Sequence, residues 1–157
     1  MRAMFGYAPA TVLVTIVGLA SGLSLTWAAQ RTERGTVSDR ISIKVGDKVF
    51  SAALVDTATA AALKARLPLS VTMTELNGNE KFVRLPGKLP TAETTPSTIH
   101  AGDVMLYGSN TLVLFYKSFS TSYRYTRIGR IDNPAGLEAA LGGGDVAVAF
   151  SAVFPRP

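Results

Sequence analysis

Apolar and polar residues alternate along much of the chain after residue 40, which is typical of β-strands with one buried face. Short turn signals separate these segments: Gly-Asp at 46–47, Asn-Gly-Asn at 77–79 and Ser-Asn at 109–110. Asn and Gly favour such turns because they accept positive φ at little cost, so the pattern predicts three hairpins. The predicted strands are 41–45, 48–54, 69–76, 80–85, 102–108, 111–117, 123–131 and 146–154.

Two segments change from a period of two to helical spacing. After Asp56, which we expect to cap a helix, apolar residues recur at helical intervals until Pro68 ends the run. A second, shorter helix is predicted over 133–141, with Pro134 near its first turn. The segments 86–98 and 118–122 are expected to be loops.

These elements predict a mainly β fold: a closed eight-stranded barrel with two short helices at its open ends. Eight mostly antiparallel strands without a βαβ rhythm favour closure, because a closed barrel leaves no exposed edge strand. The folded domain is expected to span 40–157, after a polar linker at 30–39.

Residues 1–29 are expected to lie outside this barrel, because they read as a secretory signal peptide or a membrane anchor. Arg2 is the only charged side chain, and the stretch from Thr11 to Ala29 is almost wholly apolar or small. Thr26 and Ala28 suit a cleavage site, whereas the length of the apolar run also suits an uncleaved span. Either reading predicts a periplasmic or secreted domain, or one anchored to the cytoplasmic membrane and facing outward.

Composition excludes several kinds of chemistry. The chain has no cysteine and one histidine, His100, so disulfides, thiolate chemistry and multi-histidine metal sites are excluded, and no metal or cofactor is expected. The net charge of +5 is spread thinly, so we expect no nucleic-acid partner. Membrane contact is expected only through an uncleaved N-terminal segment, and nothing in the sequence sets the oligomeric state.

The blocks "FSAALVDTATAAAL", "LPLSVTM", "GDVMLYGSNTLVLFY" and "RIGRID" follow one another in an order that resembles the bacterial cyclophilin-like fold proteins, over residues 40–151. The resemblance implies a cyclophilin barrel. Classical cyclophilins isomerise X–Pro bonds, and "KFVRLPG" resembles their strand with the arginine, which implies a matching role for Arg84. "LVLFY" resembles their apolar pocket strand, with Phe115 or Tyr116 at the matching place. The pocket glutamine has no counterpart, Trp27 lies in the N-terminal segment, and His100 lies elsewhere.

The segment from Tyr116 to Asp132 holds four basic and four aromatic residues. A β-bulge at Gly129 is predicted, because one extra residue lets Ile128 and Ile131 both face inward. The arginines would then cover the outer surface with their aliphatic stems. The alternative is an anion contact at the rim by Arg127 with Tyr125 and Tyr123 nearby.

Other polar residues predict no catalytic site. His100 is expected to be an exposed loop histidine, and Asp103 to accept hydrogen bonds from backbone amides. Glu75 and Glu80 flank the 77–79 turn and are expected to be solvated, although they could also form a carboxylate pair. The "GGGD" at 142–145 lacks the lysine of a phosphate loop and is expected to be a turn.

Taken together, the sequence predicts an exported, non-enzymatic binding module for a peptide or small molecule. The alternatives are a peptidyl-prolyl isomerase, for which Arg84 is the one catalytic candidate, and a structural envelope component without a groove. The predicted ligand-binding residues are Arg84, Tyr107, Phe115, Tyr116, Tyr125 and Arg127.

Overall fold

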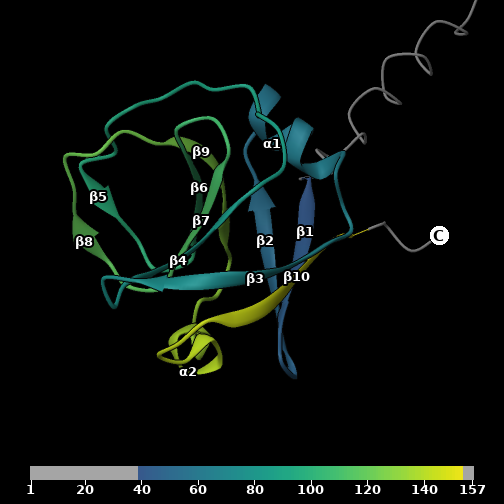
Figure 1. The fold of residues 1–157 in the computed structure, drawn as a ribbon, viewed down its shortest axis with the longest axis vertical. Helices are drawn as coiled ribbons and strands as arrows, with labels where there is room; N and C mark the ends of the chain where they lie inside the picture. The colour runs from purple at the N-terminus through teal and green to yellow at the C-terminus, as the bar shows by residue number, and fades with distance from the viewer. Residues whose placement is uncertain (1–38, 154–157) are drawn as a thin grey trace, which may run out of the picture. The chain divides into compact units, whose positions relative to one another are not determined.

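The alternating segments pair into a closed barrel of eight antiparallel strands, as predicted (Figure 1). The structure is a computed structural model that describes residues 39–153. Around the barrel the order is β1-β10-β3-β4-β7-β6-β9-β2, and β1 pairs with β2 to close it. The strands are β1 (Arg40–Val45), β2 (Lys48–Leu54), β3 (Leu69–Leu76), β4 (Glu80–Arg84), β6 (Asp103–Tyr107), β7 (Thr111–Phe115), β9 (Thr126–Ile131) and β10 (Val146–Ala152).

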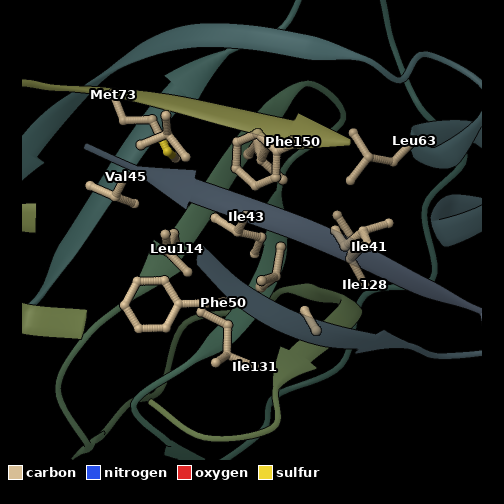
Figure 2. Close-up of a cluster of buried hydrophobic side chains, with 14 of the residues drawn as sticks. Ile41, Ile43, Val45, Phe50, Leu63, Met73, Leu114, Ile128, Ile131 and Phe150 are labelled. Carbon is tan, nitrogen blue, oxygen red and sulfur yellow. The ribbon is translucent and has the colours of Figure 1, made fainter. Parts of the chain in front are cut away.

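The barrel interior is filled by the apolar positions of each strand. Ile41, Ile43 and Val45 alternate along β1 and are almost fully buried. Ile43, the middle one, lies between Phe50 of β2 and Phe150 of β10. Figure 2 shows these side chains turned toward one another, with Leu63 joining them from a helix. The period of two in the sequence therefore separates the core face from the solvent face.

Both helices contribute apolar side chains to this core, on opposite sides of the barrel (Figure 1). They are α1 (Ala58–Lys64) and α2 (Leu137–Leu141). Leu63 comes from α1, and Leu137 and Leu141 come from α2. Because these side chains are buried, the helices are fixed to the barrel by packing rather than by their own short hydrogen-bond ladders.

Two details of the helix predictions were wrong. Thr57, not Asp56, is the N-cap of α1: its backbone is extended and its hydroxyl accepts from the amide of Ala60 at 3.2 Å. The second helix begins four residues later than predicted, because Gly136 has a φ of 79° and interrupts the helical path from Pro134.

The predicted bulge in β9 is confirmed, and the backbone of β2 lies so close to it that position 129 requires glycine. Val104 of β6 faces Gly129 while Met105 faces Arg127, so Ile128 is the extra residue. Ile128 and Ile131 are both buried, as predicted. Gly129 does not have a positive φ; a Cβ at this position would lie 2.4 Å from the carbonyl oxygen of Ala53. Strand β2 approaches too closely for any side chain.

A second apolar cluster lies outside the barrel. Strand β5 (Thr98–Ile99) begins at the last residue of the predicted 86–98 loop, and β8 (Phe119–Ser120) lies within the predicted 118–122 loop. The two strands pair with each other and stand apart from the barrel strands (Figure 1). They pack on the outer face of β6 and β7, because Ile99 and Phe119 cluster with Met105, Val113 and Phe115. The 118–122 segment, predicted as a loop, therefore contains a short strand.

The predicted N-terminal signal or anchor and most of the 30–39 linker lie outside the described residues. Among residues 39–153, no helix is both long and apolar enough to cross a bilayer.

Replacing Gly129 with alanine should destabilise the barrel by about 1–3 kcal/mol, because the new methyl group collides with the backbone of β2. Chemical denaturation measures this directly. Gly143→Ala is the matched control, since a Cβ there meets nothing within 4 Å and should change stability by less than about 0.5 kcal/mol. Equal stability of the two variants would contradict the proposed close approach.

Candidate functional site

A groove with a cavity of about 500 Å³ lies on the outer face of β4, β7 and β6, beneath the segment that contains β8. We call it the outer groove. Its position follows from strand parity: Leu112 and Leu114 belong to the barrel core, whereas Val113, between them, belongs to the outer cluster. The lining residues are Leu76, Asn77, Asn79, Glu80, Phe82, Arg84, Tyr107, Thr111, Val113, Phe119, Ser120, Thr121, Ser122, Tyr123 and Tyr125.

Aromatic rings form a continuous series along the outer groove. Tyr107 meets Tyr123 edge-on at 6.3 Å between ring centroids and meets Tyr125 at 5.7 Å. Tyr125 in turn stands edge-to-face on Phe115 at 5.5 Å, and Phe119 lies 5.7 Å from Phe115. Tyr107 and Tyr123 are about half exposed or more, so part of this aromatic surface is open to a ligand.

Glu80 is the one carboxyl among the lining residues, and only 8% of the residue is exposed. It starts β4 and shares the outer face with Phe82, because the two are separated by one strand repeat. No donor within residues 39–153 hydrogen-bonds to its carboxylate. Burial, and secondarily the Glu75 carboxylate, raises the pKa of Glu80 to about 7. Burial and the nearby Glu80 charge also raise the pKa of Tyr125 to about 12.

Asn79 and Arg84 lie toward opposite ends of the outer groove. Asn79 precedes Glu80, and its Oδ1 is the one buried side-chain polar atom of residues 39–153 without a hydrogen-bond partner. Arg84 lies four residues beyond Glu80 on the same strand face, about 13 Å away at the usual strand rise, and is exposed. The groove therefore has an acidic, acceptor-rich end and a basic end.

The predicted ligand-binding residues divide into three groups. Arg84, Tyr107 and Tyr125 line the outer groove together. Phe115 is fully buried beneath it and supports Tyr125, without lining the cavity. Tyr116 and Arg127 lie elsewhere. Tyr116 points to the opposite face because it follows Phe115 directly, and Arg127 is exposed on β9 outside the cavity.

Tyr116 belongs instead to a polar cluster around Lys81, which is 0% exposed. Lys81 Nζ donates to the Glu75 carboxylate, to the carbonyl of Gly142 at 2.8 Å and to that of Gly144 at 2.6 Å. Tyr116 donates to Glu75 at 2.8 Å. We call this the Lys81 cluster; it ties the turn after α2 to strands β3 and β4.

The Lys81 cluster also shifts the pKa values of Glu75 and Tyr116. Burial opposes ionisation of Glu75, but hydrogen bonds from Lys81, Tyr116 and the Gly78 amide together lower the pKa of Glu75. Burial and the hydrogen bond to Glu75 raise the pKa of Tyr116 to about 12. Each of the three donors of the Lys81 ammonium has an acceptor, so the burial of Lys81 requires no ligand to explain it.

Glu75 and Glu80, beside the 77–79 turn, are neither fully solvated nor paired with each other. Glu75 faces Lys81 across the β3–β4 pair, while Glu80 faces Leu76 and turns to the outer groove. The prediction that both are solvated was wrong: Glu75 is paired with Lys81, and Glu80 is only 8% exposed, between Leu76 of β3 and Phe115 of β7. Successive residues of β4 point to opposite faces, and this separates the two carboxyls.

The remaining candidates behave as structural groups. The side chain of His100 is 52% exposed, as predicted, and that of Asp103 is fully buried. Asp103 accepts from the His100 amide at 2.9 Å and from Arg130 Nε at 2.5 Å. The prediction that Asp103 accepts a hydrogen bond from a backbone amide is confirmed. Its ion pair with Arg130 also restrains the Arg130 side chain. Across residues 39–153, no three His, Asp or Glu side chains gather where they could hold a metal ion.

The chain is similar to known proteins in both sequence and fold. The profile of the cyclophilin-like family matches residues 43–151. No protein among the curated sequences matches the chain significantly. Among solved structures, the fold is similar to the solution structure of a hypothetical protein from Archaeoglobus fulgidus, with a TM-score of 0.52 and 22% identity. That match covers 78% of this chain and 99% of the other, and at this identity it shows the shared fold alone.

Replacing Glu80 with glutamine should stabilise the protein at high pH. The folded-state pKa of Glu80 is raised from 4.5 to about 7, so the unfolded state loses its proton first as pH rises. The stability contributed by the protonated carboxyl is complete below pH 4.5 and is lost as pH rises through 7. Glu80→Gln should therefore match the wild type near pH 4 and exceed it by about 1–3 kcal/mol near pH 8.

Denaturation midpoints between pH 4 and 8 measure this difference. Glu138→Gln is the control, because Glu138 is exposed and pairs only with the half-exposed Lys117 at 3.1 Å. It should change stability by less than about 1 kcal/mol at any of these pH values. A difference between wild type and Glu80→Gln that does not change with pH would contradict the burial of the carboxyl.

Proposed function

The chain belongs to the cyclophilin-like family, and we propose that this member is a non-enzymatic binding module that holds a small ligand or a peptide segment in the outer groove. Export is part of the proposal and rests on the apolar segment at 1–29, which favours a periplasmic or secreted domain or one anchored to face outward.

The observation that carries this proposal is the unpaired carboxyl of Glu80 in an aromatic groove. A glutamate that is 8% exposed and whose carboxylate has no hydrogen-bond donor reduces stability whenever it ionises. A neutral side chain at this position would avoid that cost. Groups that a protein keeps at such a cost concentrate at functional sites, and this one lies in a cavity of ligand size.

The lining of the outer groove favours binding over hydrolytic chemistry. Nucleophilic catalysis needs a serine or threonine next to a base that is itself oriented by a third group. Serine and threonine hydroxyls line the groove at Thr111, Ser120, Thr121 and Ser122, but no histidine lines it and Glu80 is its only acid. Within the described chain, the groove thus has aromatic contact surface and single charges at its two ends.

A peptidyl-prolyl isomerase is the second candidate, and one observation favours it. Arg84 lines the same cavity as Phe82, Val113 and Tyr107, so a guanidinium donor lies beside an apolar surface. An X–Pro amide has a rotational barrier of about 18–20 kcal/mol, which an apolar pocket with a nearby donor lowers by stabilising the twisted amide.

One NMR experiment separates the two functions. A proline-containing peptide added in slight excess to the isotope-labelled protein should shift backbone amides of β4, β7 and the 119–125 segment without accelerating its own cis–trans exchange. Arg84→Ala should weaken peptide binding by about threefold to tenfold, because it removes a charged contact at the rim. Arg127→Ala is the matched control: it removes the same charge outside the groove and should leave binding unchanged.

Exchange that speeds up in the wild type and not in Arg84→Ala would replace the binding proposal with the isomerase. Shifts confined to other faces of the barrel would reject the outer groove as the site.

A further inference from the structure

The Glu80 end of the outer groove presents hydrogen-bond acceptors that lack donors. The Glu80 carboxylate has no donor within the described residues, and the buried Asn79 Oδ1 has none either. Both residues line the same cavity and are adjacent in sequence at the start of β4. Arg84 forms no ion pair with Glu80; four residues of extended strand separate their backbone positions by about 13 Å. The cation that would satisfy this end must come from outside the described chain.

The aromatic series next to these acceptors suits the same kind of ligand. Ring faces carry negative electrostatic potential and attract cations within about 6 Å of the ring centre. Tyr125 and Phe119 line the cavity with Glu80, and Tyr107 continues the surface toward solvent. Phe82 and Val113 supply apolar walls for a ligand stem.

The Lys81 cluster provides a carboxylate with the donors that Glu80 lacks. Lys81, the residue after Glu80, is paired with Glu75 of β3, and Glu75 also accepts from Tyr116 and the Gly78 amide. An ammonium with three donors completes that arrangement inside the barrel. On the outer face, Glu80 and Asn79 provide acceptors for a comparable group, but no lysine is present among the lining residues.

We infer that the outer groove recognises its ligand through a primary ammonium group, which donates to the Glu80 carboxylate and Asn79 Oδ1 and packs against Tyr125 and Phe119. This inference rests on the proposed function and specifies its ligand class. A free alkylamine and the lysine side chain of a peptide share this chemistry. Neutral and anionic ligands of the same size bind the Glu80 end less tightly.

Ammonium binding at Glu80 is linked to proton release. With a pKa of about 7, Glu80 is mostly protonated at pH 6, and a bound cation favours the ionised form, so binding displaces its proton. The titratable groups around Glu80 are Glu75 of β3, Arg84 of β4, and Tyr107, Tyr123, Tyr125 and Tyr116 from the neighbouring segments. Tyr116 and Tyr125, with pKa values of about 12, stay protonated between pH 6 and 8.

The test uses three probes with one stem: n-butylamine, 1-butanol and butyrate, each titrated into the isotope-labelled full chain at pH 8 and followed by NMR. Butylamine should shift the amides of residues 79–82 and bind at least about tenfold more tightly than butanol, since hydrogen bonds to a charged group are the stronger ones. Butyrate should shift amides near Arg84 instead. A blocked lysine peptide and its norleucine counterpart then distinguish a peptide ligand from a free amine.

Variants and pH provide the controls. Glu80→Gln should weaken butylamine binding by about tenfold or more and leave butanol unchanged, whereas Glu138→Gln, on α2, should change neither. Lowering the pH from 8 to 6 should weaken butylamine binding about tenfold, because a carboxyl with a pKa of about 7 is then mostly protonated. Calorimetry at pH 6 in buffers of different ionisation enthalpy should show close to one proton released.

The outcomes separate this inference from the proposed function. If butanol and butylamine shift the groove amides with equal affinity, the ammonium inference is wrong while the binding module stands. If no probe and no peptide perturbs the groove, both proposals are wrong. Amine binding that persists unchanged in Glu80→Gln also overturns the assignment of the carboxylate.

Discussion

The structure depends on the fact that β6 and β7 are buried on both faces. Their alternate residues enter two separate apolar clusters: Leu112 and Leu114 fill the barrel, whereas Val113 and Phe115 lie under the segment that contains β8. A strand buried on one face only would leave the outer surface to solvent. Here the second cluster holds the 118–125 segment against the barrel wall, and the outer groove lies between the two. The same alternation that builds the core therefore also builds the candidate site.

Two buried charges on adjacent residues of β4 illustrate the difference between a structural and a functional group. Lys81 lies inside the barrel with three acceptors and needs nothing further. Glu80 lies outside it with no donor in the described chain, in a cavity with open space before it. The energetic rule is the same for both: a buried charge is costly unless it is paired. A pairing that is missing within the protein points to a ligand.

The strand alternation and the turn residues were sufficient to predict the hairpins, the barrel and the bulge that brings Ile128 inward. Of the residues predicted from the pattern, Arg84 and Tyr107 line the outer groove, because both lie on the face opposite the core. The pattern failed where the fold depends on long-range cover. Nothing in the sequence around Glu80 shows that it will be buried in a groove, since a glutamate next to a hairpin turn is usually solvated. The position of Tyr116, however, could have been predicted from the sequence. Because it follows Phe115 directly along the strand, it must point to the opposite face.

The proposed site depends on Glu80, a glutamate that is 8% exposed, lines the outer groove and has no hydrogen-bond donor among residues 39–153. Its side-chain carboxyl carbon can be observed by carbon-13 NMR from pH 4 to 9 and assigned by its absence in Glu80→Gln. We expect a titration midpoint near pH 7 for the ligand-free protein. A midpoint near 4.5, the value of a solvated glutamate, would show that the carboxyl is open to water or already paired, and would contradict its proposed role in the outer groove.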